Sequence, residues 1–274
     1  MSPAASTQPP AAPAAPSASR LPWQVGWRHV DCLSDLHLGP ATPRTLEALW
    51  RTLDTTDADA VLLLGDIVEA WVGDDAAADP DGFEARFLAG LRARARTRWI
   101  GVMTGNRDFL WSADCRRANG LHVLDDPTRL ELPDGGSLLL SHGDALCLDD
   151  RDYQRFRRES RTPAWQAGFL ALPLPQRQQA VRSARDASES RKRREGLAGY
   201  ADLDAPATRD WLRANLAHRL LHGHTHRPDR HELGDGLERW VLSDWDLDEP
   251  GPPRGDRLRV HADGRIERLP LVDA

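Results

Sequence analysis

Five short apolar segments, each ending in polar residues, limit what this chain can fold into more than any other feature. The segments are HVDCLSD (His29–Asp35), AVLLLGD (Ala60–Asp66), WIGVMTGN (Trp99–Asn106), SLLLSHGD (Ser137–Asp144) and HRLLHGHTH (His218–His226). Apolar residues recur at helical spacing between the first three, in PRTLEALWRTLD (Pro43–Asp54) and GFEARFLAGLRARARTR (Gly82–Arg98). Strands that alternate with helices predict an α/β layered fold whose functional residues gather at the carboxyl ends of the strands.

The two ends of the chain follow different patterns. RHELGDGLERWVLSDWD (Arg230–Asp246) predicts two strands around a turn at Gly234–Gly236, and so adds antiparallel pairing. A sandwich of sheets flanked by helices would accommodate both kinds of strand. The first 20 or so residues are almost wholly Ala, Pro, Ser and Thr, which predicts a disordered tail over residues 1–22 and folding from about Trp23 onward.

Composition narrows the class of protein. The chain of 274 residues is 40% hydrophobic and 28% charged, which suits one large soluble domain or a domain with an insertion. Its net charge of -6 argues against a nucleic-acid partner, and no run approaches the roughly 20 apolar residues of a membrane-spanning helix. The three cysteines, Cys32, Cys115 and Cys147, are too widely spaced for a disulfide framework or a zinc ribbon, and favour a reducing cytosol.

One block departs from the acidic average. Residues 151–200 hold twelve Lys or Arg against five Asp or Glu, and include the apolar stretch PAWQAGFLALPLP (Pro163–Pro175). Two interpretations remain open: a helical insertion whose charged face is solvated, or a lid that meets an anionic, apolar ligand or an anionic membrane surface. We expect a core formed by residues 23–150 and 206–274, and a helical cap over residues 151–205.

The five strand ends carry donors typical of a metal site. They are oxygen and imidazole groups without thiolate: Asp35, His37, Asp66, Asn106, His142, His224 and His226. Residues i and i+2 of an extended segment face the same side, which would bring Asp35 and His37 to one ion, and would align His224 with His226. Seven donors exceed what one ion takes, whereas two ions that share a carboxylate would use them all.

Other residues near these donors have simpler interpretations. The neighbouring glycines would allow the backbone to crowd around one centre: Gly65, Gly105, Gly143 and Gly223. The remaining histidines are expected to be structural or exposed: His29, His122, His218, His222, His231 and His261.

The ordered motifs D-x-H, G-D, G-N, H-G-D and G-H-x-H resemble those of the calcineurin-like metallophosphoesterase superfamily, from about residue 28 onward. The longer words SDLHLG, LLGDIVEAWVGDD, GNRDFL, SHGDALCLDD and HGHTHRP are similar to those of the UDP-2,3-diacylglucosamine diphosphatase family, which acts in the lipid A pathway of Gram-negative bacteria. The resemblance implies a four-layer α/β/β/α sandwich with a helical cap, two Mn²⁺ ions, and a peripheral place on the cytoplasmic face of the inner membrane.

The resemblance also assigns roles to residues. One Mn²⁺ would be held by Asp35, His37, Asp66 and His226, and the other by Asp66, Asn106, His142 and His224, with Asp66 as the bridge. The reaction would be hydrolysis of UDP-2,3-diacylglucosamine at its α-phosphorus, which gives UMP and 2,3-diacylglucosamine 1-phosphate. The catalytic residues would be Asn106, Arg107 and His224, and the substrate contacts Asn106, Arg107, Asp150, Ser188, Lys192 and His224.

Arg107 stands where the third motif of the superfamily usually has a His near the leaving group. An Arg stays protonated and cannot act as the general acid that an alkoxide leaving group needs. A diphosphate bond expels a phosphate monoester, a weaker base, so protonation matters less. Arg107 can then clamp two phosphoryl oxygens, which favours diphosphate over monoester chemistry.

Further contacts are expected from the cap. RDASESRKRRE follows the family pattern only loosely, and the third polar contact would be Arg193, Arg194 or Glu195. An acyl-chain chamber would be lined by Trp165, Phe169, Leu170 and Leu172. Two other functions remain as alternatives: a phosphoesterase for soluble nucleotides, and a scaffold of the same fold without catalysis. The basic, apolar cap disfavours the first, and the complete ligand set disfavours the second.

Overall fold

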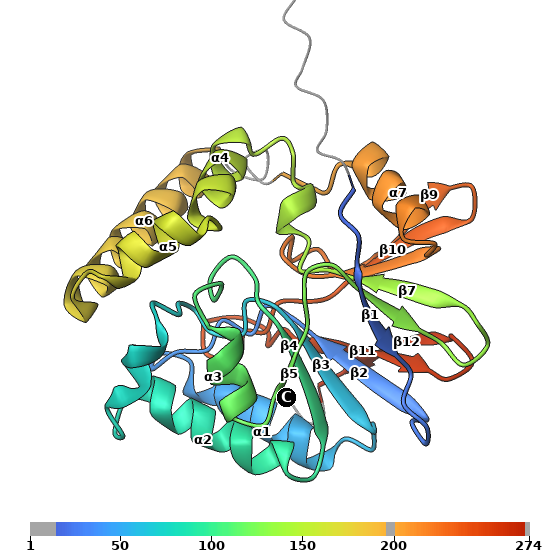
Figure 1. Cartoon of the computed structure of the whole chain (residues 1–274), viewed down its shortest axis with the longest axis horizontal. Helices are drawn as coiled ribbons and strands as arrows, with labels where there is room; N and C mark the ends of the chain where they lie inside the picture. The colour runs from blue at the N-terminus through green and yellow to red at the C-terminus, as the bar shows by residue number, and fades with distance from the viewer. Residues whose placement is uncertain (1–14, 196–200, 272–274) are drawn as a thin grey trace, which may run out of the picture.

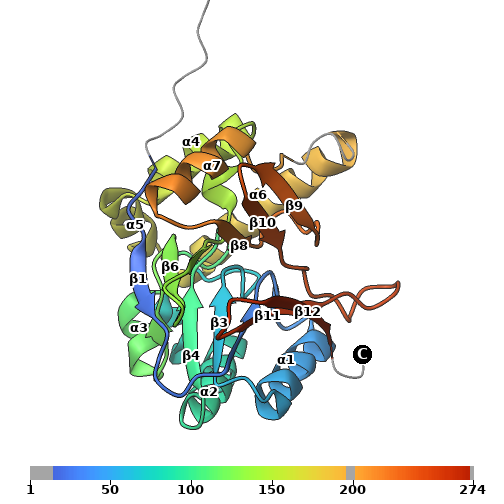
Figure 2. The ribbon, with the colours of Figure 1, turned by 90° about the vertical axis from the view of Figure 1, so that its right-hand side faces the viewer.

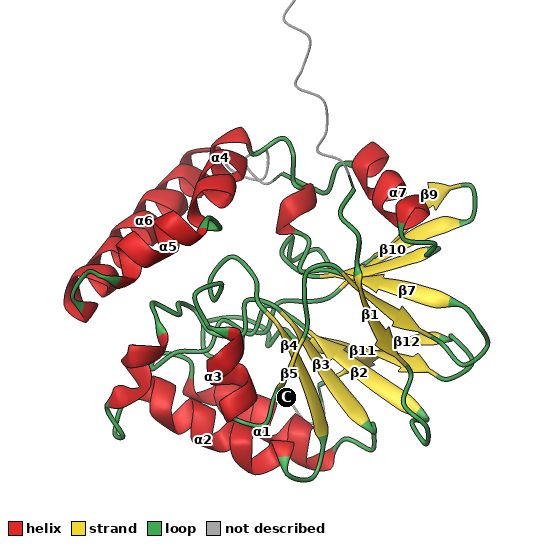
Figure 3. Cartoon of the chain, viewed as in Figure 1, coloured by secondary structure: helices red, strands yellow, loops and turns green. Residues whose placement is uncertain are grey.

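Two six-stranded sheets pack face to face in the computed structural model, which describes residues 15–195 and 201–271. Helices cover the outer face of each sheet, so that the layers follow the order helix, sheet, sheet, helix (Figure 1). Colouring by secondary structure separates these layers from a purely helical segment at one end of the molecule (Figure 3). The four-layer sandwich predicted from the sequence is confirmed.

The first sheet has the strand order β12-β11-β2-β3-β4-β5, with β2 to β5 parallel and β11 antiparallel to β2 (Figure 2). Its strands are β2 (His29–Leu33), β3 (Ala60–Leu64), β4 (Trp99–Met103), β5 (His122–Val123), β11 (Asp256–His261) and β12 (Ile266–Pro270). The helical segments between them are α1 (Pro43–Thr55), η1 (Asp74–Ala78), α2 (Phe83–Ala95) and α3 (Ala113–Ala118).

The second sheet has the order β1-β6-β7-β8-β10-β9. Its strands are β1 (Ser19–Pro22), β6 (Thr128–Glu131), β7 (Ser137–Leu140), β8 (Arg219–His222), β9 (Arg230–Gly234) and β10 (Leu237–Val241). A short helical turn, η2 (Asp144–Leu146), follows β7, and α7 (Ala205–Ala214) covers the outer face of this sheet. The strands β9 and β10 form the antiparallel pair expected around Gly234–Gly236.

The N-terminal boundary differs from the expected one. Residues 19–22, which the sequence placed in the disordered tail, form β1 and pair in parallel with β6. Leu21 is buried among the side chains that fill the space between the two sheets. Because Leu21 fills part of the core, the ordered chain begins before Trp23.

The central strand β3 shows why these sequences form buried strands. All five residues of AVLLL are buried, as expected for a parallel strand that is covered on both faces. Val61 and Leu63 pack with α1 and α2, whereas Leu62 and Leu64 pack between the sheets. The alternation follows from the two-residue period of a strand.

A buried ion pair joins β2 to β11. Asp31 is fully buried and accepts hydrogen bonds from Arg259, from Nε at 2.7 Å and from Nη2 at 3.0 Å. Thr56 also donates to Asp31, at 2.6 Å. Strand β11 is therefore held against β2, the strand that leads to the first predicted metal ligand.

Three helices form the expected cap: α4 (Arg151–Ser160), α5 (Pro163–Leu170) and α6 (Leu174–Glu195). Arginines of two cap helices are among the residues that tie the cap to the core. Arg157 of α4 donates to the buried Asp144 at 2.8 Å. Arg177 of α6 is 2% exposed, binds both carboxylate oxygens of Asp75, and donates to the Val72 carbonyl at 2.5 Å. No helix among the described residues is both long and apolar enough to span a membrane.

Candidate metal centre

The predicted ligands lie in the loops that follow β2, β3, β4, β7 and β8, where the two sheets meet. The expected extended geometry is wrong for several of them, because their backbone is left-handed. The φ angles are 53° for Asp35, 47° for His37, 52° for Asp66, 66° for His224 and 52° for His226. A left-handed residue turns the chain sharply, so these loops aim their side chains inward by a route that strand periodicity does not describe.

One group of ligands consists of Asp35, His37 and His226. Atom Nε2 of His226 lies 3.3 Å from Asp35 Oδ1, and Nε2 of His37 lies 3.9 Å from the same oxygen. The two Nε2 atoms are 3.3 Å apart. Asp35 is fully buried, and its Oδ1 has no hydrogen-bond partner among the described residues, whereas its Oδ2 accepts the backbone N–H of His224. A buried carboxylate oxygen facing two imidazole nitrogens fits a divalent cation.

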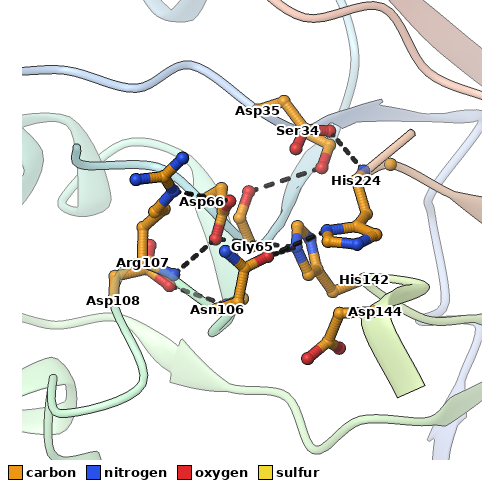
Figure 4. Close-up of polar contacts among 12 residues, drawn as sticks. Ser34, Asp35, Gly65, Asp66, Asn106, Arg107, Asp108, His142, Asp144 and His224 are labelled. Atoms are coloured by element: carbon orange, nitrogen blue, oxygen red, sulfur yellow. Dashed lines mark hydrogen bonds and ion pairs between the residues drawn. The ribbon is translucent and has the colours of Figure 1, made fainter. Parts of the chain in front are cut away.

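A second group lies beside the first and contains Asp66, Asn106, His142 and His224 (Figure 4). The amide oxygen of Asn106 is 3.0 Å from His142 Nε2 and 2.8 Å from His224 Nδ1. Asp66 Oδ1 is 3.5 Å from His142 Nε2. Ligand atoms of Asp35, Asp66 and His142 also come within 4.8 Å of one another, so the two groups are adjacent. The structure thus brings all seven predicted ligands together.

Two glycines allow this close approach. A Cβ atom at Gly105 would lie 2.2 Å from Asp66 Oδ1, and one at Gly223 would lie 2.1 Å from Asp35 Oδ2. Any larger residue would therefore displace a carboxylate that the cation sites need.

The electric field of the site favours positive charge. Burial alone would lower the pKa of His142, but nearby carboxylates, led by Asp66 and Asp35, raise it to about 9. Burial, reinforced by the charge of Asp66, raises the pKa of Asp108 to about 6. Several buried carboxylates therefore face one small volume, which is the arrangement that bound cations stabilise.

Arg107 lies at the edge of this centre. Its backbone N–H donates to Asp66 Oδ1 at 2.8 Å, and its guanidinium Nε is 4.0 Å from Asp66 Oδ2. The guanidinium is half-buried and reaches toward the open side of the site. This position allows Arg107 to contact a phosphoryl group that the cations would also contact.

Glu69 lies within the site, although the sequence analysis did not single it out. Its Oε2 lies 3.1 Å from His37 Nδ1, while its Oε1 lies 2.7 Å from Arg185 Nη2 and 3.4 Å from Arg107 Nη1. One carboxylate therefore orients a predicted ligand, the predicted clamp and an arginine of the cap. The only signal was its place in the word LLGDIVEAWVGDD, three residues after Asp66.

The predicted contacts in the cap have a mixed outcome. Asp150 is half-buried at the N-terminus of α4, where its Oδ1 accepts the Tyr153 N–H at 3.1 Å. Its role as a sugar contact stays a prediction. Ser188 and Lys192 belong to α6, but their side chains lie outside the described residues, as do those of Arg193, Arg194 and Glu195.

An apolar cavity of about 570 Å³ lies between the cap and the metal ligands. Trp165 and Phe169 line it as expected, together with Phe109 and Phe156. Leu170 and Leu172, expected in the same chamber, are each 41% exposed and are absent from its described lining. They lie at the turn from α5 to α6, where their side chains face solvent.

His222 is the first histidine of the word HGHTH. It lies beside the centre but does not face it. It is fully buried, and its Nδ1 is 2.9 Å from the Gly223 carbonyl oxygen. Burial, together with the charge of Arg239, lowers its pKa to about 3. This neutral, buried ring matches the structural role expected for it.

Comparisons with known proteins agree with this geometry. The model of the calcineurin-like phosphoesterase family matches residues 28–228. A UDP-2,3-diacylglucosamine hydrolase of Bordetella parapertussis is 44% identical over 245 residues, which cover 88% of this chain and 94% of that protein. Proteins of the same name from Chromobacterium violaceum and Xanthomonas axonopodis pv. citri are 45% and 40% identical, over 87% of this chain and 97% and 98% of theirs.

Proposed function

The chain belongs to the calcineurin-like phosphoesterase family, and from that premise we propose that it hydrolyses UDP-2,3-diacylglucosamine in lipid A biosynthesis. The observation that carries the proposal is the apolar cavity of about 570 Å³. It lies beside the metal ligands, and Arg107 forms part of its lining. A phosphoesterase for soluble nucleotides has no use for an aromatic chamber beside its phosphate site. Each buried acyl methylene contributes about 0.8 kcal/mol, so two chains would dominate binding.

We propose that the centre holds two Mn²⁺ ions. Asp35, His37, Asp66 and His226 would hold one ion, and Asp66, Asn106, His142 and His224 the other, as the adjacency of the two groups supports. Ions held there supply positive charge to the phosphoryl oxygens and activate a water molecule for in-line attack. The oxygen and imidazole donor set is suited to Mn²⁺.

The residues of the chain then divide the remaining work. Arg107 offers two guanidinium N–H groups to the phosphoryl oxygens and stabilises charge that develops on them. Asn106 and His224 would position the diphosphate beside the ions, because Asn106 Oδ1 and His224 Nδ1 lie 2.8 Å apart within the centre. Attack at the α-phosphorus gives UMP and 2,3-diacylglucosamine 1-phosphate.

The surface of the cap supports a peripheral place on the cytoplasmic face of the inner membrane. Phe156, Leu170 and Leu172 are exposed large apolar residues of the cap, and Arg155 and Arg158 are exposed on α4. Apolar side chains with neighbouring cations favour an interface with anionic lipid. Such a position would let acyl chains pass from the bilayer into the apolar cavity.

The experiment that tests the function is release of UMP by the purified chain. We expect Mn²⁺-dependent release from UDP-2,3-diacylglucosamine and little from UDP-glucosamine. Equal turnover of the two would contradict the role of the apolar cavity. Absence of turnover with any phosphoester would favour the scaffold of the same fold.

Asp66→Ala tests the bridging ligand. The variant should lose turnover and most of its bound metal, because it removes a carboxylate shared by both sites. Metal content measured by inductively coupled plasma mass spectrometry separates loss of metal from loss of rate. Full activity with two bound ions would contradict the bridge.

A further inference from the structure

The metal centre lies between two cavities of different chemistry. The first is the apolar cavity beside Asn106 and Arg107. The second, here called the polar cavity, has a volume of about 520 Å³ and is bounded by the loop after β2, the loop after β10 and helix α6. Both volumes are in the range of pockets that enclose small molecules. The substrate of the proposed function likewise has two halves, an acylated sugar and a nucleotide.

The two cavities meet at the residues that would bind the diphosphate. Glu69, Arg107, Val181 and Arg185 line both of them. Away from this junction the metal ligands divide: His37 and His226 line the polar cavity, whereas Asn106 lines the apolar one. A molecule that passes from one cavity to the other therefore crosses the metal centre at the two arginines.

The walls of the polar cavity would reject an acyl chain. They carry Glu84, Arg182, Asp246 and Glu249, and Arg254 is held there by Asp244 at 3.0 Å. Burial of methylenes against these groups would strip water from charges without replacing it. The same groups suit a nucleotide, because carboxylates accept hydrogen bonds from ribose hydroxyls and arginines bind phosphate.

The polar cavity also offers apolar surface for a base. Pro40, Phe83 and the buried Trp245 contribute to its lining. A pyrimidine ring needs a flat apolar contact on its face and polar partners at its edge. Thr42 and Gln178, both half-buried, supply polar side chains on the same walls.

We propose that the polar cavity is the nucleotide site, with the uridine between the loop after β2 and helix α6. The inference rests on the proposed function and adds the direction in which the substrate lies. The diphosphate crosses at Arg107 and Arg185, where it replaces Glu69 as the partner of both guanidinium groups. The two products consequently leave through different openings, UMP from the polar cavity and the acylated sugar phosphate from the apolar one.

Two matched substitutions test this direction. Ala41 lines only the polar cavity and Ala184 only the apolar one, and both side chains are exposed, so that Trp can replace either without disturbing the core. The readouts are the inhibition constants of UMP and of 2,3-diacylglucosamine 1-phosphate in the Mn²⁺-loaded enzyme. We expect Ala41→Trp to raise the constant for UMP at least tenfold and to leave that for the sugar phosphate within about twofold.

Ala184→Trp should give the opposite pattern. A second probe of the polar cavity, Arg182→Ala, removes an exposed side chain and should weaken UMP inhibition about three- to tenfold without filling space. Circular dichroism and thermal unfolding confirm that each variant is folded.

The outcomes separate the two levels of the argument. Absence of UMP release from UDP-2,3-diacylglucosamine by the unchanged chain would overturn the proposed function. Normal turnover with a UMP constant that neither Ala41→Trp nor Arg182→Ala alters would overturn the nucleotide site alone. An inhibition constant for UMP that rises only in Ala184→Trp would also overturn the nucleotide site.

Discussion

Glu69→Gln is the most informative single change, because the carboxylate of Glu69 has three partners that an amide cannot all keep. His37 Nδ1 lies 3.1 Å from Glu69 Oε2, and a proton that the carboxylate holds on Nδ1 would leave Nε2 unprotonated. That Nε2 atom is directed at Asp35 and His226. Burial alone would raise the pKa of Glu69, but the contact with His37 and the positive charges of Arg107 and Arg185 outweigh it and hold that pKa below its usual value. Glu69 is therefore ionised at neutral pH.

Glutamine leaves one acceptor where there were two. If its oxygen stays with Arg185 and Arg107, its NH₂ group faces His37 Nδ1 and favours the tautomer that carries the proton on Nε2. The protonated Nε2 atom could not bind a metal. If the amide turns over, the NH₂ group faces two guanidinium groups instead. Loss of such an outer partner typically costs 10- to 100-fold in metal affinity or activity, or about 1.4 to 2.8 kcal/mol.

The assay is a titration of the metal-free protein with Mn²⁺. Bound metal and the rate of UMP release are measured at each Mn²⁺ concentration. We expect one of the two binding steps to weaken about 10- to 100-fold, and the step assigned to Asn106, His142 and His224 to remain. Glu47→Gln is the matched control, because Glu47 is an exposed residue of α1 that pairs only loosely with Arg51. Affinity within twofold of the unchanged chain would refute the orienting role of Glu69.

Three further predictions test other parts of the structure. Arg107→Lys should keep both metal ions and reduce kcat about 100-fold, because a point charge cannot fork onto two oxygens; a loss of bound metal would make Arg107 structural. Arg177→Met should weaken docking of the cap by about 2 to 4 kcal/mol, since the bonds to Asp75 and a buried carbonyl are lost. Hydrogen exchange should then rise in α5 and α6, and KM should rise for the acylated substrate. Unchanged hydrogen exchange would refute the role of Arg177 in holding the cap to the core. His222, with a pKa lowered to about 3 from an ordinary 6.5, should make the folded state less stable as pH falls below 6.5, by about 2 kcal/mol at pH 5. Thermal unfolding of the metal-free protein against pH should show this loss, and His222→Asn should remove it; parallel curves for the two proteins would refute it.

The sequence predicted the strands that carry the metal ligands because each is a short apolar run closed by polar residues. The paired strands β9 and β10 were predicted equally well, since Gly234–Gly236 marks their turn. Elements that lack such signals in the sequence were not predicted. β1 is a four-residue strand that follows the Ala/Pro-rich segment, and only Leu21 is buried in it, so composition hid it.

The grouping of ligands was predictable and its geometry was not. Parallel strands end at one edge of a sheet, which suffices to place Asp35, Asp66 and Asn106 near one another. The left-handed backbone at Asp35 and His37 leaves no mark in the sequence, because the surrounding contacts impose it. Glu69 and Arg177 were missed for a related reason: their partners are up to about a hundred residues away in the chain.

The buried pair of Asp31 and Arg259 has a consequence for how the chain reaches this fold. It joins residues 228 positions apart, so β11 pairs with β2 only after nearly the whole chain is available. A slip of one residue would turn Arg259 to the opposite face of the sheet and leave Asp31 buried without its partner, at a cost of about 3 to 5 kcal/mol. Pairings this distant form slowly, and wrong registers compete with the right one. The pair thus acts during folding, as a selector of register for the last strands to join.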